Sequence, residues 1–315
     1  MILGYSFILL AALCWGASGI IGKYWGTVGV ADALLLSQAR VTFAWLVLFI
    51  GLVLFGRRHL RISFRELLRF ALLGLIGVAG ANFMLYFAIN RMNVAVADLI
   101  QFTAPLLVAL YLSARGIERM DLPKVLALAL SLIGSGLALG VVNGSFNLPA
   151  IAVASAFASA LCYGFLIVFG KGLTRDYSMW TFLHYALLTA TLFWLCITPP
   201  MEFVQHLKEP AELARLFGFG MLSILLPYVF FFSGLKRVPA SRAGIVSTFE
   251  PVVMAVGSWL VLGDPLSRWQ VVGVALVLAA IAVVEMTSKA MFGDESDPGK
   301  EQEEMNHRDI EAQRA

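Results

Sequence analysis

The run ALLLSQARVTFAWLVLFIGLVLF, residues 33–55, contains a single charged side chain, that of Arg40. A helix needs roughly 20 mostly apolar residues to cross about 30 Å of hydrocarbon. This run therefore predicts a membrane-spanning helix. The whole chain has the same character, because 60% of its 315 residues are hydrophobic and 14% are charged. A soluble domain contains roughly 45–50% apolar and about 25% charged residues.

Nine further apolar stretches accompany this run, so the expected fold is an all-α polytopic membrane protein with ten transmembrane helices. The ten predicted spans are 5–22, 33–55, 70–89, 94–114, 125–142, 150–170, 180–198, 216–235, 243–262 and 269–284. The first span is predicted to be a spanning helix and not a signal peptide, because no basic residue precedes it. The first charge in the chain is Lys23.

The basic residues of the predicted loops divide unequally between the two sides of the membrane. The loops on the side of the N-terminus hold Arg57, Arg58, Arg61, Arg65, Arg69, Arg115, Arg119, Lys124, Lys171, Arg175, Lys236, Arg237 and Arg242. The opposite loops hold Lys23, Arg91, Lys208, Arg215 and Arg268. Because short cytoplasmic loops are enriched in Lys and Arg, both termini are expected in the cytoplasm.

The remaining charge and cysteine patterns exclude several classes of site. Residues 287–315 are rich in acidic residues from Asp294 onward and predict a disordered cytoplasmic tail. Cys14, Cys162 and Cys196 lie inside predicted helices, without the spacing of a metal site or a disulfide framework. The net charge of +3 is spread over the loops, so no nucleic-acid partner is expected. We expect neither a metal nor a cofactor.

Short sequences recur along the chain at a nearly constant distance. ALCWG at residues 12–16 returns as ALCYG at 160–164, an offset of 148, and Gly22-Lys23 returns as Gly170-Lys171 at the same offset. Three further pairs match at an offset of 146: Arg91 with Arg237, Pro105 with Pro251, and Glu118 with Asp264. Chance similarity between apolar helices is the alternative explanation. A repeat of five helices must enter the membrane from opposite faces, and such inverted repeats are typical of secondary transporters.

Three features resemble the drug/metabolite transporter superfamily, and within it the EamA family. They are Trp15-Gly16, the intramembrane Arg40, and Glu250-Pro251-Val252 followed by the turn Gly263-Asp264-Pro265. The resemblance covers about residues 5–285. It departs from the family pattern in the first half, where Thr103-Ala104-Pro105 lacks the acidic residue, and at Tyr163, which replaces a Trp.

The resemblance implies a first EamA-like repeat at 5–142 and a second at 150–285. It implies a multi-pass protein of the bacterial inner membrane that moves a small organic metabolite, with amino-acid efflux a frequent activity in the family. The expected partners are a small-molecule substrate and membrane lipid, and the oligomeric state stays open. The family's cavity lies between the halves, where alternating access would expose it to each side in turn.

Arg40 and Glu250 are the candidates with the strongest chemistry. A charge inside a spanning helix costs at least roughly 2.5 kcal/mol unless it is paired or hydrated. Arg40 could hold a substrate carboxylate or fix helix packing. Glu250 could bind and release a coupling proton, bind a substrate ammonium, or serve the helix break at Pro251. A direct ion pair between Arg40 and Glu250 is a further alternative.

Polar and aromatic residues in the predicted spans complete the candidate set. The remaining substrate-binding candidates are Trp15, Asn82, Tyr86, Gln101, Tyr163 and His184, and the hinge candidates are Pro105 and Pro251. Each also has a packing explanation, because polar side chains join transmembrane helices by hydrogen bonds and aromatic residues gather at membrane interfaces. Asp98 lies one turn into its helix, where an interfacial position is favoured.

The sequence favours a transporter over the other classes of membrane protein. An enzyme would need a nucleophile with its base or a metal cluster, and His59, His184, His206 and His307 are scattered. The sequence lacks a Gly-rich phosphate loop of the G-x-x-x-x-G-K type, which argues against direct ATP coupling. A non-transporting receptor or scaffold remains the alternative function.

Overall fold

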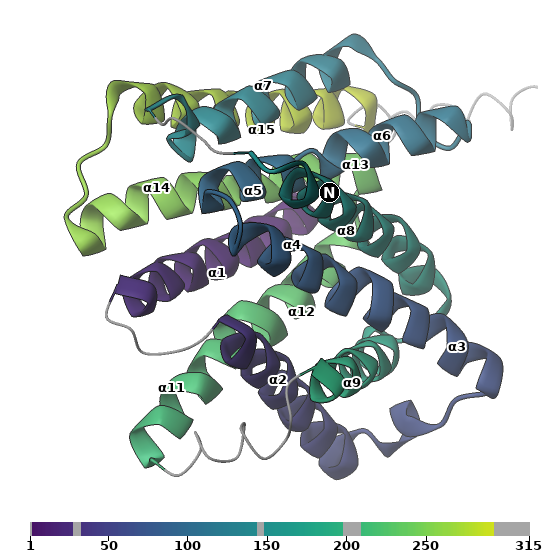
Figure 1. Ribbon diagram of the computed structural model, residues 1–315. Helices are drawn as coiled ribbons and strands as arrows, with labels where there is room; N and C mark the ends of the chain where they lie inside the picture. Colours follow the sequence, from purple (N-terminus) through teal and green to yellow (C-terminus); the bar gives the residue numbers. More distant parts are fainter. Residues whose placement is uncertain (1, 28–32, 144–147, 198–208, 293–315) are drawn as a thin grey trace, which may run out of the picture.

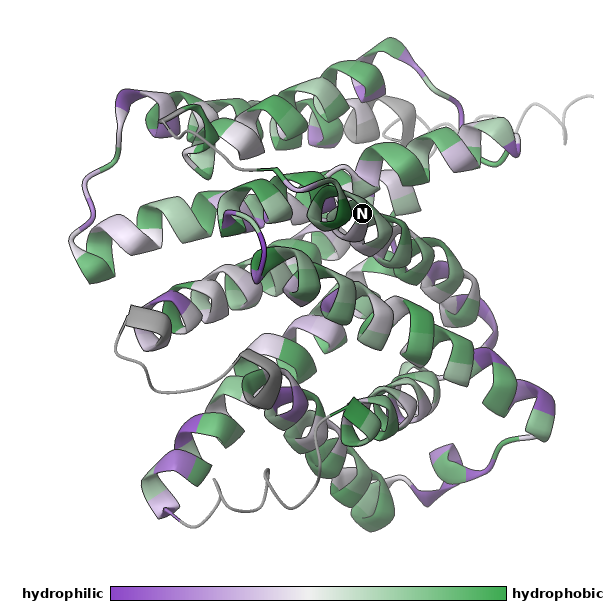
Figure 2. Cartoon of the chain, in the orientation of Figure 1, coloured by the Kyte–Doolittle hydropathy of each residue, from purple (hydrophilic) through white to green (hydrophobic). Residues whose placement is uncertain are grey.

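The computed structural model describes residues 2–27, 33–143, 148–197 and 209–292 (Figure 1). Every regular element within these ranges is a helix. Nine helical segments there are long and apolar enough to cross a membrane, and Leu122–Ala138 is a shorter apolar helix. The expected ten-helix fold is thereby confirmed. In Figure 2 apolar residues cover the middle of the bundle, and hydrophilic residues gather in the loops at its two ends.

The first half contains five spans, and two of them are interrupted. Its elements are α1 (Ile2–Thr27), α2 (Ala33–Phe55), α3 (Phe64–Leu72), a π-helical segment η2 (Leu73–Gly80), α4 (Ala81–Ile89), α5 (Val94–Gln101), α6 (Ala104–Ala114) and α7 (Leu122–Ala138). The segments α3, η2 and α4 form the third span, and α5 with α6 forms the fourth. Short 3-10 turns, η1 (Arg57–Leu60) and η3 (Val141–Asn143), follow α2 and α7.

The second half repeats this order of elements. It contains α8 (Ala150–Asp176), α9 (Met179–Ile197), α11 (Pro210–Gly220), a π-helical segment η4 (Met221–Leu225), α12 (Leu226–Leu235), α13 (Ala240–Ser247), α14 (Phe249–Leu262) and α15 (Arg268–Phe292). The π-helical segment again interrupts the third span of the half, and a break again divides the fourth. The repeat is therefore visible in the backbone as well as in the sequence.

The breaks in the two fourth spans have the same chemical origin. Proline lacks an N–H, so it cannot continue the helical hydrogen-bond ladder, and Pro105 and Pro251 follow the two breaks. Beside Pro105, the Thr103 hydroxyl donates to the Ile100 carbonyl at 2.7 Å. In the second half the Thr248 hydroxyl donates to a carbonyl three residues earlier at 2.6 Å. At both breaks a threonine hydroxyl thus donates a hydrogen bond to a backbone carbonyl. Backbone polar groups inside a membrane need such partners within the protein, because no water is present there.

The contacts between spans are reciprocal between the halves. Helix α1 packs against α12, α13 and α14 of the second half, and α8 packs against their counterparts α4, α5 and α6. The pairs α2–α9 and α7–α15 each join matching helices, and α7 and α15 lie side by side along one edge of the bundle (Figure 1). The first helix of each half thus packs against the third and fourth spans of the other half, which is the arrangement of two inverted repeats.

Several span boundaries differ from the predicted ones. The third span begins at Phe64, because Ser63 and Glu66 form a capping box that starts a helix before the apolar stretch. The eighth begins at Pro210, which is well placed at a first helical position. Helix α15 reaches Phe292, so residues 287–292 of the expected tail are helical. Residues 293–315 of that tail lie outside the described ranges.

Candidate functional site

A cavity of about 820 Å³ lies between the two halves and receives side chains from both. Lys23, Asn93 and Asp264, all exposed, line its mouth, and Trp15 and Glu250 line its interior. The mouth lies at the C-terminal end of α1, which we call the Lys23 side of the molecule. The opposite end of the bundle, where α8 ends near Lys171, is called the Lys171 side.

An ion pair spans part of the mouth. The Lys23 Nζ lies 2.6 Å from an Asp264 carboxylate oxygen, and it joins the end of α1 to the loop between α14 and α15. Both side chains remain about half exposed, at 50% and 54%. Exposed pairs of this kind contribute little to stability, about 0–1 kcal/mol, so the pair can break and form at small cost.

Arg40 projects from α2 into the cavity and contacts the third span. Its guanidinium donates a hydrogen bond from Nη2 to Asn82 Oδ1, and its carbon atom Cζ lies 5.3 Å from the Tyr86 ring centroid. Asn82 is itself held in place, because its Nδ2 donates to the Val78 carbonyl at 2.7 Å. Arg40 Nε is buried and has no hydrogen-bond partner among the described residues. Asn82 thus holds one edge of the guanidinium, and Nε remains able to donate a hydrogen bond to a bound group.

Two carboxyl groups share the cavity with Arg40. Asp98 comes from α5 and Glu250 from the first turn of α14, and Glu250 lies within electrostatic range of both Asp98 and Arg40. Arg40 and Glu250 do not form the direct ion pair that the sequence left open, since neither takes part in the ion pairs found among the described residues. Behind the Lys23–Asp264 pair at the mouth, the described interior of the cavity therefore presents Arg40, Asp98 and Glu250 as separate charged groups.

Gln101 also lines the cavity and ties the fourth span to α8. Its Nε2 donates to the Ser159 hydroxyl at 2.7 Å, and that hydroxyl donates to the Ala81 carbonyl at 2.7 Å. These two hydrogen bonds connect α5, α8 and α4. Gln101 is thus fixed by interhelical hydrogen bonds at the edge of the cavity.

Aromatic rings form the deep end of the cavity. The Trp15 ring meets the Tyr163 ring at a centroid distance of 6.4 Å and the Tyr228 ring at 6.1 Å, both edge to face. Phe231, behind them, lies 5.5 Å from Trp15 and is fully buried. These rings separate the cavity from the Lys171 side.

His184 is absent from the cavity wall. It lies on α9 against α2, where its ring stacks on Phe49 at 5.6 Å and on Trp45 at 6.3 Å. Its side chain is buried, and in the part of the chain that the structure describes Nδ1 has no hydrogen-bond partner. The structure brings together the other predicted substrate-binding residues and leaves His184 in a packing position.

Other residues of the cavity were missed or misjudged from the sequence. Asp98 was favoured as an interfacial acid, yet it lines the cavity. Tyr228 and Ser223, from the eighth span, and the mouth pair Lys23–Asp264 were not predicted as site residues. A signal was present for the mouth pair, because Lys23 and Asp264 both belong to positions matched between the repeats.

Polar contacts gather on the Lys171 side, and one of them, the hydrogen bond between Ser241 and Glu118, joins the two halves. Within the second half, Lys171 Nζ of α8 donates to the Leu235 carbonyl at the end of α12 at 2.5 Å and to the Val238 carbonyl just after it at 2.8 Å. Glu118 lies in an ion pair with Lys124 at 3.1 Å. It also accepts a hydrogen bond from the Ser241 hydroxyl at the start of α13. Lys171 and Glu118 are the repeat counterparts of Lys23 and Asp264.

The glycines of α1 and α12 let these helices meet on the same side. A Cβ added at Gly234 would lie 2.6 Å from the Gly4 carbonyl oxygen, and one added at Gly4 would lie 2.7 Å from Val238 Cγ1. Small residues allow such close backbone approach in membranes. The described structure is therefore open toward the Lys23 side and closed toward the Lys171 side.

The sequence model of the EamA-like transporter family matches residues 2–140 and 150–286, which together span most of the chain. The chain belongs to the EamA-like transporter family. It is therefore a multi-pass membrane transporter of the EamA type and not an enzyme, and its substrate is a small molecule.

Three relatives of this EamA-family chain are named as transporters. An uncharacterized transporter of Archaeoglobus fulgidus is 26% identical over 290 residues, which cover 89% of this chain and 95% of the relative. The uncharacterized inner membrane transporter YicL of Salmonella typhimurium is 22% identical over 90% and 95% of the two chains. The threonine/homoserine exporter RhtA of the same species is 24% identical over 65% and 67%.

A solved crystal structure shares the fold of this EamA-family chain. Its TM-score is 0.74 at 20% sequence identity, with 91% of this chain and 98% of the other covered.

Proposed function

We propose that this EamA-family protein exports an amino acid or a closely related zwitterionic metabolite by alternating access. The observation that carries the proposal is the presence of Arg40, Asp98 and Glu250 around one cavity between the repeats. An amino acid carries a carboxylate and an ammonium, so it needs both a cationic and an acidic partner. The named activity of RhtA, a threonine/homoserine exporter, supports the same substrate class.

The roles of the three charged residues follow from their chemistry. A guanidinium binds a carboxylate in a bidentate manner, and Arg40 is already held at one edge by Asn82. Glu250 and Asp98 are the acids available to a substrate ammonium, and Glu250 is the candidate for a coupling proton. A volume of about 820 Å³ lies within the range of about 300–1,000 Å³ usual for small-molecule sites. The aromatic rings at the deep end would contact an apolar side chain.

The proposed orientation places both termini in the cytoplasm of a bacterial inner membrane. The Lys171 side then faces the cytoplasm, since its loops carry thirteen Lys and Arg against five on the other side. YicL, a relative that covers nearly the whole chain, is named an inner membrane transporter. In this orientation the cavity is open to the outside, as it would be on release of an exported substrate.

Export requires a second state in which the cavity is open on the Lys171 side and closed on the Lys23 side. The Lys171 side would open by breaking the hydrogen bond between Ser241 and Glu118, and the mouth would close around Lys23 and Asp264. The breaks before Pro105 and Pro251 lie in matching spans and are the proposed hinges of this motion.

The test is efflux from sealed proteoliposomes loaded with a panel of amino acids and other metabolites. Wild type is compared with Arg40→Ala and with Arg115→Ala, a matched control at an exposed position at the end of α6. We expect selective efflux of a zwitterionic solute by wild type and the control. Loss of a charge-assisted hydrogen bond costs about 1.5–3 kcal/mol, so Arg40→Ala should lower transport at limiting substrate by roughly 10- to 100-fold. Equal efflux by Arg40→Ala would remove Arg40 from the substrate site.

A further inference from the structure

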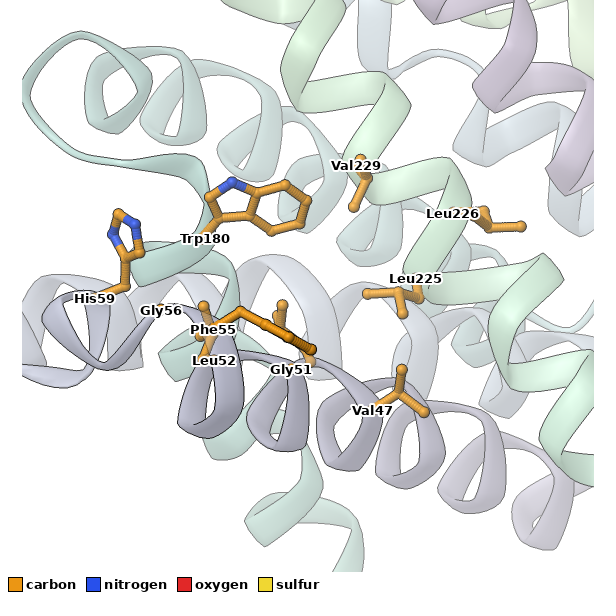
Figure 3. Close-up of a pocket in the computed structure, with 11 residues that line it drawn as sticks. Val47, Gly51, Leu52, Phe55, Gly56, His59, Trp180, Leu225, Leu226 and Val229 are labelled. Atoms are coloured by element: carbon orange, nitrogen blue, oxygen red, sulfur yellow. The ribbon is translucent and has the colours of Figure 1, made fainter.

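A second hollow, separate from the cavity, lies on the outside of the bundle near the Lys171 side. It has a volume of about 460 Å³ and shares no lining residue with the cavity. Helix α2, the start of α9 and the junction of η4 with α12 form its walls (Figure 3). We call it the lateral groove.

The walls of the lateral groove are apolar along most of its length. The apolar lining consists of Val47, Leu48, Leu52, Phe55, Leu225, Leu226 and Val229. Gly51 forms an open part of the wall, because a Cβ added there would meet no atom within 4 Å. The groove can therefore hold an apolar chain without rearrangement of its backbone.

The length of the groove corresponds to one leaflet of a bilayer. Its lining on α2 runs from Val47 to Phe55, and a rise of about 1.5 Å per residue makes this roughly 12 Å. The hydrocarbon core is about 30 Å thick, so one leaflet accounts for about 15 Å. An acyl chain of a phospholipid that lies along α2 matches this length.

One end of the groove has the character of the membrane–water interface. The His59 imidazole and the Trp180 indole lie at the same end, away from Val47 (Figure 3). Trp180 is 40% exposed, and tryptophan is enriched at the level of the lipid headgroups. A lipid with its acyl chain in the groove would place its phosphate next to His59.

Two cationic residues precede His59 at this end of the groove. Arg57 and Arg58 precede His59 in η1 and are exposed. The Arg57 Nε donates to the Val53 carbonyl at 2.9 Å, and the Arg58 Nε lies 3.3 Å from His59 Nε2. Neither arginine belongs to an ion pair among the described residues. The charge at the end of the groove thus complements an anionic headgroup.

We propose that the lateral groove is a binding site for an anionic phospholipid, with one acyl chain along α2 and the phosphate held by Arg57 and Arg58. The proposal is independent of the substrate of the cavity. Arginines contribute in two ways, because they form charge-assisted hydrogen bonds to phosphate and attract anionic lipid near the surface. The apolar groove supplies the second part of the site and distinguishes it from a basic loop alone.

The test is retention of added lipid by the purified full-length protein, measured by native mass spectrometry. Phosphatidylglycerol is compared with phosphatidylcholine of the same acyl chains. Each arginine near a membrane surface adds roughly a fivefold preference for anionic lipid, so we expect phosphatidylglycerol to be retained about 30-fold more strongly. The double variant Arg57→Gln/Arg58→Gln should lower its retention to the level of phosphatidylcholine.

The groove itself is tested by filling it. Gly51→Leu should lower retention of phosphatidylglycerol at least tenfold, and the variant is expected to fold because its new side chain meets open space and leucine is a better helix former than glycine. Gly218→Leu, on exposed α11 and also facing open space, is the matched control. Equal retention of the two lipids by wild type, or unchanged retention in Gly51→Leu, would overturn the proposal.

Discussion

Trp15 and Tyr163 occupy the same position in the two repeats and contact one another edge to face, with ring centroids 6.4 Å apart and an interplanar angle of 78°. Matched positions of an inverted repeat come together only where the axis that relates the halves passes between them. The axis therefore runs through the aromatic end of the cavity. The two halves share this wall, so each half contributes to the boundary between the cavity and the Lys171 side.

The contact between Trp15 and Tyr163 should appear as a coupling in stability. We expect Trp15→Ala to lower the free energy of unfolding by about 3–5 kcal/mol, and the pair Trp15→Ala/Tyr163→Ala to show an interaction energy of about 0.5–1.5 kcal/mol. A double-mutant cycle of unfolding in mixed micelles measures this value. The same cycle with Trp269→Ala, whose ring has no contact with Trp15, should be additive. Additivity in both cycles would contradict the contact.

Glu250 is expected to make transport depend on pH. A carboxyl group that binds and releases a proton changes its charge across the working pH range, whereas glutamine stays neutral at every pH. Efflux from proteoliposomes should vary with pH in wild type and should be nearly constant in Glu250→Gln. Asp176→Asn, at the exposed end of α8, is the control and should keep the wild-type profile. A pH profile unchanged by Glu250→Gln would assign proton coupling to another group.

The ion pair of Lys23 with Asp264 should influence the mouth of the cavity more than the stability of the fold. Lys23→Gln is expected to change the free energy of unfolding by less than about 1 kcal/mol, because both side chains are half exposed. It should increase labelling of a cysteine placed at Ser18, in a background in which Cys14, Cys162 and Cys196 are replaced by serine.

Salt provides the control for this prediction. Raising the ionic strength to about 1 M shortens the Debye length to about 3 Å. Wild type should then be labelled at the rate of Lys23→Gln, and the variant should show no further change. A salt effect of equal size in both proteins would show that the ion pair does not restrict the mouth.

Lys171 should stabilise the closed side of the molecule. Its ammonium donates to carbonyls at the C-terminal end of α12, where a cation in a partly buried position contributes up to about 2 kcal/mol. Lys171→Met retains most of the side-chain volume and should lower the free energy of unfolding by about that amount. Arg175→Met, an exposed position one turn along α8, should change it by less than about 0.5 kcal/mol. Unfolding followed by circular dichroism distinguishes the two variants.

Most of the fold was predictable from the sequence because hydrophobic length alone identifies spans in a membrane. The predicted starts at Ala33, Val94 and Ala150 are those of α2, α5 and α8. The inverted repeat was predictable from the recurrence of ALCWG as ALCYG, and the structure confirms it. The largest errors at the starts of spans fall at Phe64 and Pro210, where a polar cap and a helix-starting proline extend helices beyond their apolar stretches.

The site was less predictable, because position along a span gives depth and not direction. Asp98 and His184 illustrate this limit: the first faces the cavity and the second faces a neighbouring helix. The partner of Arg40 is Asn82, 42 residues away in sequence. That contact depends on how α2 and the third span are rotated about their axes, and a single sequence contains no direct record of such rotations.

Helix α7 has a consequence for the surrounding bilayer. Its 17 residues extend about 25 Å, which is about 5 Å less than the hydrocarbon thickness, while its partner α15 has 25 residues. Such hydrophobic mismatch costs a fraction of a kcal/mol per Å and is met by local thinning of the bilayer. A bilayer that thins beside α7 meets a neighbour, α15, that needs no such thinning. Lipid chain length therefore acts on this transporter through the α7–α15 pair, and shorter-chain lipids favour that edge.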